Sequence, residues 1–459
     1  MTILKDIINK NSKKKLFIFP NKKYLTYEQF YNKALNFAKN YESRLNKTKN
    51  KTVFLRMDRS IDFYIAVIGL AFLKAIIIPI SNKLSKGETF AFRKIYQPDL
   101  EIDSISVTKK NIKSLKIDKD FLKKAKIVFF TSGATDAPKG VLNNFQNLLN
   151  SSNEFANLAS YKNNDIIIHN WSQYYMAGFF NMFLCPLVKG SSIFFDKEIG
   201  VDSYLGYWDI LKKNKITLSY LSPTMAQALI SFSNYKKEKL NLIRTKFFST
   251  GAFLYKSTAS RFKKEFDVDL IDCYGITEVG GSFALSSKFS LENKLSKFSK
   301  GIKIKLLRNN EICIKSKFMF EGYLKKYSKV KKYKHSYFKS GDLGKIYKGK
   351  YSITGRLKEI IKKGGEPVSL LHIEDITLKH EGVKDVLAKG VTSEFWGEDI
   401  ELDVIFSASP YKLNKDNKIN LLKSYLGQNL PRIQMPRKIN SVTHIPKTSI
   451  GKNYRRYFN

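Results

Sequence analysis

Cysteine and histidine are both rare in this chain of 459 residues, which has three cysteines and five histidines. Cys185, Cys273 and Cys313 lie far apart, with no C-x-x-C pair and no His/Cys cluster. This spacing argues against a disulfide scaffold and against a structural zinc site, and it is typical of a reducing compartment. No histidine joins a Ser/Asp constellation, so we expect all five to be structural. The predicted location is the cytoplasm.

Acidic residues are scarce as well, since 40 Asp and Glu face 81 Lys and Arg and give a formal net charge of +41. The lysines are spread from end to end, and the sequence lacks zinc-finger spacing, RNP-like aromatic motifs and basic helices. We therefore interpret lysine as a general surface residue, with a specific nucleic-acid interface as the alternative. Such a surface favours anionic partners, among them ATP, CoA or an acidic carrier protein.

Long apolar runs are also missing. The N-terminus has no apolar core flanked by a cleavage site, so no signal peptide is expected. The longest apolar run, Phe63 to Ile80, is almost long enough to cross a bilayer, but Lys74 interrupts it and Pro79 lies near its end. We expect a buried helix over 62–73, a buried strand over 75–80, and no transmembrane segment.

Hydrophobic residues make up 43% of the chain, which is enough for a globular protein with a large core. After a strand at 52–55 and a lysine-rich connector up to Lys126, short apolar runs alternate with helical periodicity. This alternation predicts βαβ units and mostly parallel sheets. Strands are expected at 166–168, 193–195, 217–221, 245–248 and 270–274, and helices at 175–188 and 255–266.

The pattern changes near Gly301, where alternating apolar residues on both sides of Asn309 and Asn310 predict antiparallel hairpins, with a second hairpin around Lys348 to Lys350. From Arg356 onward a smaller α+β unit is expected. The predicted fold class is α/β: a large N-terminal domain of stacked, mostly parallel sheets with helices and a small antiparallel β-barrel-like part, then a small mobile α+β domain. The predicted domains are residues 1–355, with the β-rich part at 301–355, and residues 356–459.

One stretch, Ile127 to Asn144, reads IVFFTSGATDAPKGVLNN. A short buried strand is followed by small and hydroxyl residues and by Lys139. Small residues let backbone N–H groups approach an anion, hydroxyls add donors, and the lysine adds a mobile positive charge. The stretch thus suits a loop that wraps a polyphosphate, although it lacks Walker spacing. Taken alone, it remains equally compatible with a plain polar loop.

Three further motifs follow in order: DCYGITE at 272–278, SGDLG at 340–344 with TGRLKEIIKKGG soon after, and IPKTSIGK ending at Lys452. With the loop, they resemble the adenylate-forming superfamily (acyl-CoA synthetases, free-standing amino-acid adenylation domains and beetle luciferases), whose loop runs TSG-[Ser/Thr]-TG-x-PKG. The resemblance covers nearly the whole chain. It implies an ATP-dependent acid–thiol ligase that forms an acyl-adenylate, releases pyrophosphate, and passes the acyl group to CoA or to the phosphopantetheine of a carrier protein.

The resemblance also assigns roles to residues. It implies that Tyr274 stacks on adenine, that Thr277 bonds the α-phosphate, and that Glu278 holds Mg²⁺, together with Thr131. Asp342 has two acceptor oxygens for the ribose diol, and Arg356 is the second ribose contact. The ATP-binding set is Thr131, Ser132, Gly133, Ala134, Thr135, Lys139, Gly251, Ala252, Asp272, Cys273, Tyr274, Gly275, Ile276, Asp342 and Arg356.

Lys452 closes the chain where the superfamily carries its catalytic lysine. A mobile ammonium that reaches the substrate carboxylate and the α-phosphate neutralises charge as pentavalent phosphorus forms. The implied catalytic residues are therefore Lys452, Thr277 and Glu278. Lys358 falls at the superfamily's hinge position, about which the small domain pivots.

The acyl pocket is expected to include Tyr175, Gly178 and Thr250. Tyr175 stands where many acyl-CoA synthetases have a histidine, and no aspartate occurs between Trp171 and Phe180 to hold an α-amine. A carboxylic acid without a free amine is therefore favoured as the substrate.

Two alternatives remain within the superfamily. One is a free-standing amino-acid adenylation enzyme. The other is a degenerate, non-catalytic member that acts as a scaffold, suggested by Ala134 in place of a usual hydroxyl, Asp136 in place of a usual glycine, and Tyr175.

Overall fold

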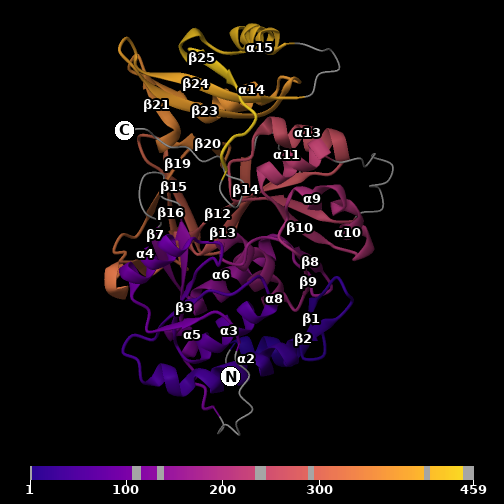
Figure 1. Cartoon of the computed structure of the whole chain (residues 1–459), viewed down its shortest axis with the longest axis vertical. Coiled ribbons are helices and arrows are strands. Elements are labelled where there is room, and N and C mark those ends of the chain that lie inside the picture. The colour runs from indigo at the N-terminus through magenta and orange to yellow at the C-terminus, as the bar shows by residue number, and fades with distance from the viewer. Residues whose placement is uncertain are drawn as a thin grey trace.

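The computed structural model describes residues 3–105, 115–131, 139–232, 244–287, 294–407 and 414–447. The chain begins at the lower end of the view in Figure 1, and its last described elements form a separate upper layer. Two large sheets with helices lie below, and a small sheet lies above. The predicted α/β fold with a small α+β unit after it is confirmed.

Within the described ranges, the largest sheet has 13 strands in the order β15-β16-β19-β20-β14-β13-β12-β11-β10-β8-β9-β1-β2. The run from β12 to β1 is parallel, as the alternation of strands and helices predicted. The strands of this half are β1 (Lys15–Ile18), β2 (Tyr24–Thr26), β8 (Ile166–His169), β9 (Ser192–Phe195), β10 (Leu218–Leu221), β11 (Lys246–Ser249) and β12 (Leu270–Ile276).

The other half of this sheet is antiparallel and includes the two predicted hairpins, β15–β16 and β19–β20. It is continuous with the parallel half, because β13 pairs with both β12 and β14. The predicted β-rich part therefore extends the main sheet. Its strands are β13 (Gly281–Ser286), β14 (Lys294–Phe298), β15 (Ile302–Leu306), β16 (Glu311–Ser316), β19 (Phe338–Tyr347) and β20 (Lys350–Arg356).

A second sheet has seven strands among the described residues, in the order β18-β17-β7-β6-β4-β3-β5. Strands β3 to β6 are parallel, whereas β7, β17 and β18 (Val330–Lys332) add antiparallel pairs. The remaining strands are β3 (Thr52–Leu55), β4 (Ile76–Pro79), β5 (Leu100–Ile102), β6 (Lys126–Thr131), β7 (Lys139–Asn144) and β17 (Gly322–Leu324).

The long apolar run forms helix α3 (Ile61–Phe72) followed by strand β4, as predicted. Every α3 residue from Phe63 onward is buried, packed chiefly against helix α2 (Tyr27–Asn46). A capping box between Thr26 and Gln29 starts α2, since each side chain bonds the other's backbone N–H. No helix in the described part of the chain is long and apolar enough to span a membrane.

The expectation of a plain lysine-rich connector up to Lys126 is wrong. The segment contains helices α4 (Lys86–Tyr96) and α5 (Phe121–Lys124) as well as strand β5. A capping box between Ser85 and Glu88 starts α4. The helix is largely exposed. The sequence does carry this start signal, but the lysine-rich composition of the segment led to the prediction of a connector.

The other helices of the large part cover the faces of the two sheets. The predicted helix at 175–188 is continuous from Met176 to Lys189, with a π-helical turn in the middle. The helices are α1 (Ile3–Asn11), α6 (Phe145–Leu158), α7 (Met176–Phe179), the π-turn (Phe180–Leu184), α8 (Cys185–Lys189), α9 (Val201–Leu205), α10 (Tyr207–Lys213), α11 (Pro223–Phe232) and α13 (Lys256–Phe266), with 3-10 turns at Thr277–Val279, Lys326–Ser328, Leu357–Glu359 and Arg432–Gln434.

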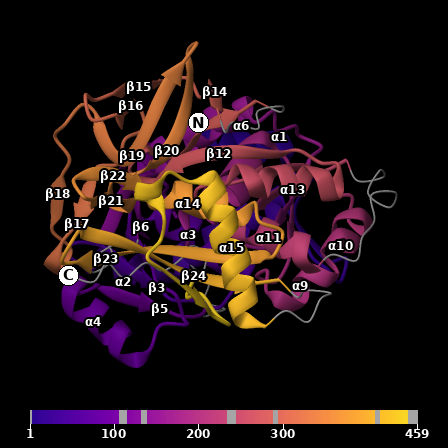
Figure 2. The same ribbon diagram turned by 90° about the horizontal axis from the view of Figure 1, so that it is seen from above.

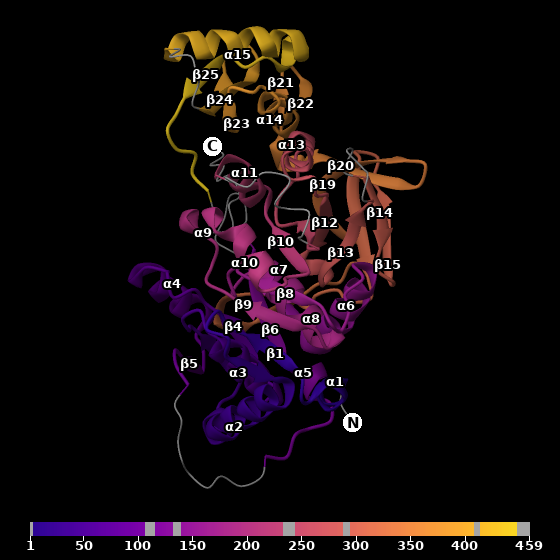
Figure 3. The same ribbon diagram turned by 90° about the vertical axis from the view of Figure 1, so that its right-hand side faces the viewer.

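The residues after β20 form a small sheet with its own hydrophobic core. In Figure 3 this unit stands apart above the large part, and Figure 2 shows helix α15 lying across its outer face. Lys363 and Asp399 form an ion pair inside the small unit at 2.5 Å, with both side chains 7% exposed. Its elements are β21 (Ile360–Lys363), β22 (Glu366–Ser369), α14 (Leu370–Leu378), β23 (Val383–Ser393), β24 (Gly397–Phe406), α15 (Lys415–Asn429) and β25 (Lys438–Ser441).

Candidate active site

The predicted site residues gather at the carboxyl ends of two central parallel strands, β11 and β12. Ser249 and Asp272 are paired there in register, so the chain that follows each strand leaves the sheet side by side. Thr250 to Ala252 follow β11, and Cys273 to Ile276 complete β12. In an open α/β sheet, the crevice beyond the carboxyl ends of the strands is where ligands bind.

Three residues from separate motifs meet at this edge. The hydroxyl of Tyr274 on β12 donates to one oxygen of Asp342 at 2.6 Å. Arg356 donates from Nε to the other oxygen of Asp342 at 2.5 Å. Asp342 and Arg356 face each other as register partners of β19 and β20. Burial raises the pKa of Tyr274, and the Asp342 carboxylate raises that of Arg356.

Asp342 is held by residues that the sequence reasoning did not assign. Its backbone N–H donates to the Ser340 hydroxyl at 3.0 Å, and that hydroxyl donates to the Ile312 carbonyl at 2.7 Å. The N–H of Gly341 donates to the buried Glu311 carboxylate at 3.1 Å. Gly341 has a φ of +72°, which a side chain would strain, so glycine at this position suits the turn. Glu311 lies 30 residues away in an ordinary strand, and no local signal marks it.

Glu278 and Lys139 lie on the other side of this edge. Glu278 is buried and accepts a hydrogen bond from the hydroxyl of Tyr323 at 3.2 Å. Burial raises the pKa of Glu278, while Tyr323, Lys139 and Arg356 oppose that rise. Tyr323 sits in the short strand β17 and belongs to none of the motifs, which is why it was missed.

The buried strand predicted before the loop of the 127–144 stretch is confirmed as β6, whereas the strand after the loop, β7, was not predicted. Thr131 ends β6 and faces Lys139, the first residue of the antiparallel strand β7. The predicted phosphate contacts Ser132, Gly133, Ala134 and Thr135 lie outside the described residues, as do Asp136 and the catalytic candidate Lys452. Thr277 opens the 3-10 turn that directly follows β12.

Asp272 is the most strongly perturbed carboxyl group at the edge. Its side chain is buried, and burial raises the pKa of Asp272 from 3.8 to about 7, an effect that a hydrogen bond from the Cys273 N–H partly offsets. Burial likewise raises the pKa of the Cys273 thiol to about 12. A carboxyl group in this state exchanges its proton near neutral pH.

An aromatic wall stands next to the β11 end. Trp171 and Tyr175 stack with ring centroids 6.2 Å apart and an interplanar angle of 24°. A Cβ at Gly251 would lie 3.4 Å from the Trp171 ring and 3.9 Å from the Tyr175 hydroxyl, so both side chains face this glycine. At Gly178 a Cβ would lie 2.5 Å from the Ser172 carbonyl oxygen, which keeps this position small.

Burial raises the pKa of Tyr175 to about 12, and the charge of Arg356 opposes that rise. The hydroxyl is therefore protonated at neutral pH and is a hydrogen-bond donor. Tyr175 and Arg356 come from distant parts of the chain, and the folded structure places them within electrostatic range of each other. The structure thus brings the predicted acyl and nucleotide residues together.

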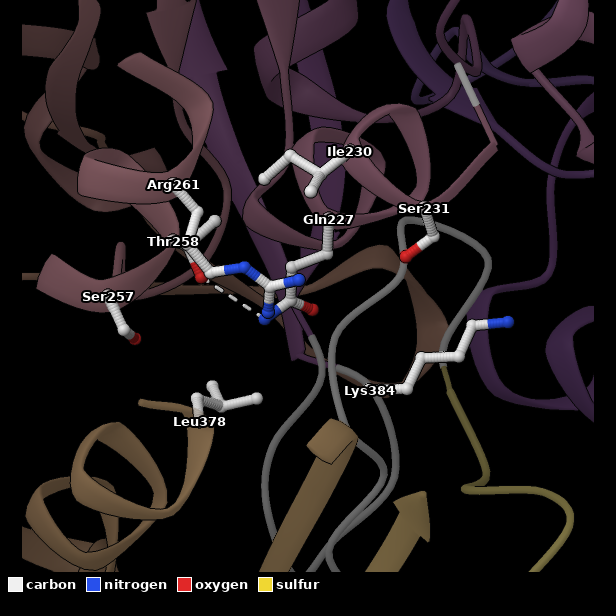
Figure 4. Close-up of a pocket in the computed structure, with 8 residues that line it drawn as sticks. All are labelled: Gln227, Ile230, Ser231, Ser257, Thr258, Arg261, Leu378 and Lys384. Atoms are coloured by element: carbon white, nitrogen blue, oxygen red, sulfur yellow. Dashed lines mark hydrogen bonds between the residues drawn. The ribbon is translucent and has the colours of Figure 1, made fainter. Parts of the chain in front are cut away.

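Contacts also join the large part to the small unit. The Ser257 hydroxyl, near the start of α13, donates to Asp375 of α14 at 2.9 Å, and the Tyr255 hydroxyl donates to Glu374. Figure 4 shows the neighbouring crevice, which Leu378 and Lys384 of the small unit line together with Gln227 and Thr258 of the large part. The ammonium of Lys384 lies over the ring of Phe232, 4.7 Å from its centroid. Lys358 is exposed in the 3-10 turn between β20 and β21.

Within the described part of the chain, no group of three or more His, Cys, Asp and Glu residues is placed to hold a metal ion. The three cysteines are free and buried. Glu278 offers one buried carboxylate at this edge, to which the oxygens of a bound ligand would add. Mg²⁺ suits such a donor set, because it is commonly held by one or two carboxylates plus substrate phosphates.

The polar and aromatic side chains therefore lie where an open α/β sheet binds its ligands, beyond the carboxyl ends of its strands. Residues 108–324 match the family described as AMP-binding enzyme. A 2-succinylbenzoate–CoA ligase from Staphylococcus epidermidis is 24% identical over 96% of this chain and 94% of its own length. An oxalate–CoA ligase from Arabidopsis thaliana is 26% identical over 71% of this chain and 65% of its own.

Among solved structures, an anthranilate–CoA ligase in complex with anthranoyl-AMP superposes with a TM-score of 0.85. The superposition covers 98% of this chain and 95% of the ligase chain, at 18% sequence identity. The chain thus contains an AMP-binding domain, and the curated relatives described above are CoA ligases, in agreement with the resemblance that the four ordered motifs indicated.

Proposed function

We propose that the protein is an acid–thiol ligase that joins a carboxylic acid to AMP and then transfers the acyl group to CoA. The observation that carries this proposal is the Tyr274–Asp342–Arg356 cluster, which lies at the same strand edge as Glu278 and the Trp171–Tyr175 wall. A nucleotide and a carboxylic acid bound side by side there place the α-phosphate next to the carboxylate.

On the nucleotide side, Tyr274 offers an aromatic ring for adenine, and Asp342 with Arg356 offers an acceptor and a donor for the ribose hydroxyls. Thr131 and Lys139 flank the loop that would hold the β- and γ-phosphates. Thr277 bonds the α-phosphate in this scheme. Mg²⁺ held by Glu278, with Thr131, would neutralise phosphate charge during the displacement of pyrophosphate.

On the acyl side, Trp171 and Tyr175 form a flat aromatic wall, and Gly178 and Thr250 complete the proposed pocket. The Tyr175 hydroxyl is a donor suited to a carboxylate or another polar group of the acid. The relatives described above act on 2-succinylbenzoate and oxalate. We therefore propose a small or aromatic carboxylic acid without a free α-amine as the substrate.

The second half-reaction needs a different arrangement of the small unit. We propose that residues 356–459 form a domain that turns about Lys358, breaks the Ser257–Asp375 and Tyr255–Glu374 contacts, and withdraws Lys452 from the acyl-adenylate. A thiol can then reach the activated carbonyl carbon. Bond formation to sulfur releases AMP, and the thiol proton is lost to solvent.

CoA is the proposed thiol, since the curated relatives are named as CoA ligases. The phosphopantetheine arm of an acidic carrier protein has the same thiol chemistry, and the net charge of +41 favours such a partner. Because the reaction consumes ATP and the described cysteines are free, we propose the cytoplasm as its location.

The test is ATP–pyrophosphate exchange with a panel of acids that includes 2-succinylbenzoate, oxalate, anthranilate, fatty acids and amino acids. We expect exchange with at least one non-amino acid, and a loss of about 100-fold or more in Lys452→Ala, because the ammonium is needed as charge develops. Lys423→Ala, which removes an exposed lysine on α15, is the matched control and should exchange normally.

Each other outcome selects an alternative. Exchange confined to amino acids would identify an amino-acid adenylation enzyme. Absence of ATP binding in calorimetry would favour the non-catalytic scaffold, to which Ala134, Asp136 and Tyr175 point. Undiminished exchange in Lys452→Ala would remove this lysine from the adenylation step.

A further inference from the structure

We propose that Arg59 is a positioning residue for the acyl pocket: its guanidinium fixes the backbone behind Trp171 and thereby sets the aromatic wall against which the acid is selected. This inference rests on the proposed function. Arg59 lies in the turn between β3 and α3, far from all four motifs in the sequence, and the sequence reasoning did not single it out.

The guanidinium of Arg59 makes four hydrogen bonds to three backbone carbonyls. Nη1 donates to the Trp171 carbonyl at 2.6 Å, Nη2 to the His169 and Asp196 carbonyls at 2.6 Å each, and Nε to the Asp196 carbonyl at 2.8 Å. His169 is the last residue of β8, and Asp196 directly follows β9. One side chain of the seven-stranded layer thus ties together two strand ends of the larger sheet.

The charge of Arg59 is satisfied in an unusual way. Besides the three carbonyl oxygens, Arg59 Nη2 lies 3.5 Å from Nδ1 of His169, and the guanidinium carbon lies 4.3 Å from the centroid of the Phe195 ring. A planar group with donors on its edges and an aromatic ring on its face fits this place better than an ammonium. Burial lowers the pKa of His169, so its ring is neutral beside this cation.

Further contacts from the same turn hold the chain between Trp171 and Tyr175. The side-chain amide of Gln173 donates to the Met57 and Asp58 carbonyls at 3.1 Å each, and the Tyr174 hydroxyl donates to the Met57 carbonyl. The turn at 57–59 therefore holds one side of the loop after β8 through hydrogen bonds. Arg59 is its charged member and the one bonded to Trp171 itself.

Trp171 connects this loop to the proposed acyl pocket. Its indole N–H donates to the Tyr220 carbonyl at 2.9 Å, and its ring lies against Gly251 and stacks on Tyr175. With the backbone held by Arg59 and the ring held by Tyr220, the indole has one orientation. A shift of the Trp171 backbone would move the wall, whereas Tyr274 and Arg356 are held by their hydrogen bonds to Asp342.

The test compares Arg59→Met and Arg59→Lys with the parent protein in the exchange assay. For Arg59→Met we expect kcat/KM for the preferred acid to fall about 100-fold, since misplacement of a positioning group by an ångström has effects of this size. The order of preference among the acids should change, while the KM for ATP stays within about twofold. Arg59→Lys keeps the charge but loses the planar, forked set of donors. Its kcat/KM should be about tenfold higher than that of Arg59→Met.

Tyr27→Phe is the matched control, because it also removes a buried donor from two backbone carbonyls, those of Pro186 and Ser191, in the same large part. We expect it to leave the acid preference unchanged. Equal losses for ATP and for the acid in Arg59→Met, with an unchanged order of acids, would overturn the proposal and leave Arg59 as a purely structural clamp.

A second readout does not depend on activity. The emission of Trp171, isolated by subtracting the spectrum of Trp171→Phe, should become more accessible to acrylamide in Arg59→Met. If Arg59→Met does not fold, Arg59→Lys carries both measurements. Should the parent exchange pyrophosphate with no acid, the proposed function fails, and the quenching result still decides whether Arg59 positions Trp171. Unchanged quenching would overturn the positioning role.

Discussion

The proposed nucleotide side and the proposed acyl side of the site are built differently. On the nucleotide side, side chains bond to one another: Tyr274 and Arg356 both bind the carboxylate of Asp342, and Tyr323 binds Glu278. On the acyl side, a side chain bonds to the main chain: Arg59 holds the carbonyls behind the aromatic wall.

This difference follows from what each side has to recognise. ATP is the same in every reaction of this kind, so fixed side chains in short motifs suffice. The acid varies, and a wall formed by packed aromatic rings can change shape through distant backbone contacts. One substitution in the bonded side-chain cluster should therefore weaken ATP binding strongly. A change in the aromatic wall should instead alter which acid is selected.

The largest effect is expected from Asp342→Asn, which breaks the nucleotide cluster. The asparagine side chain has one acceptor oxygen, whereas the carboxylate uses one oxygen for Tyr274 and the other for Arg356. The negative charge opposite Arg356 is lost as well. We expect the KM for ATP to rise about 100-fold, equivalent to about 3 kcal/mol, with the KM for the acid nearly unchanged. Steady-state exchange at varied ATP and varied acid measures both values.

Asp399→Asn is the control for this substitution, because Asp399 pairs with Lys363 at the same 2.5 Å but inside the small unit. Breaking that buried pair should lower stability by about 3 kcal/mol and leave the KM for ATP unchanged. A KM for ATP in Asp342→Asn that equals the parent value would contradict the assigned ribose contact.

A smaller effect is expected on stability, from the buried carboxyl of Asp272. Its pKa is about 7 in the folded protein and near 3.8 in the unfolded chain, so the folded state binds the proton more tightly. This contribution to stability is present at low pH and is lost as the pH rises from about 4 to 7. Between pH 5 and pH 8 it should cost about 2.5 kcal/mol.

Denaturant unfolding of the parent and of Asp272→Asn at several pH values measures this contribution. The asparagine variant has no group to titrate at this position, so the stability of the parent relative to the variant should fall by about 2.5 kcal/mol between pH 5 and pH 8. Parallel pH profiles would show that Asp272 does not have a raised pKa in the folded state.

The smallest effect is expected from Tyr175→Phe, which sharpens the comparison on the acyl side. The phenyl ring keeps the stacking on Trp171, and only the hydroxyl is lost. We expect kcat/KM for the acid to fall about tenfold, or about 1.4 kcal/mol, with no change for ATP. Tyr161→Phe, whose hydroxyl donates to the Asn181 carbonyl in the core, should leave both values unchanged. A loss shared by ATP and the acid in Tyr175→Phe would contradict a pocket role.

Local patterns were enough to predict most of the elements. The apolar run at 63–80 contains a buried helix and a buried strand, and the alternation near Asn309 marks a hairpin, because burial imposes a period of 3.6 or 2 on the sequence. Helix α4 was missed, since its exposed lysines conceal the period and only the cap between Ser85 and Glu88 remains as a signal.

The sequence by itself determined the resemblance to AMP-binding enzymes, most of the order of strands and helices, and the motif residues proposed to bind the nucleotide, because each of these depends on neighbours in the chain. Only the tertiary structure decided that Tyr274, Asp342 and Arg356 form one bonded cluster, that Tyr323 meets Glu278, and that Arg59 lies behind Trp171. These contacts join residues 14 to 112 positions apart. The Tyr274–Asp342–Arg356 cluster depends on the order of strands within the larger sheet, and the other two contacts depend on how the two sheets pack. The spacing of these residues along the chain gives no information about how the strands and sheets are arranged.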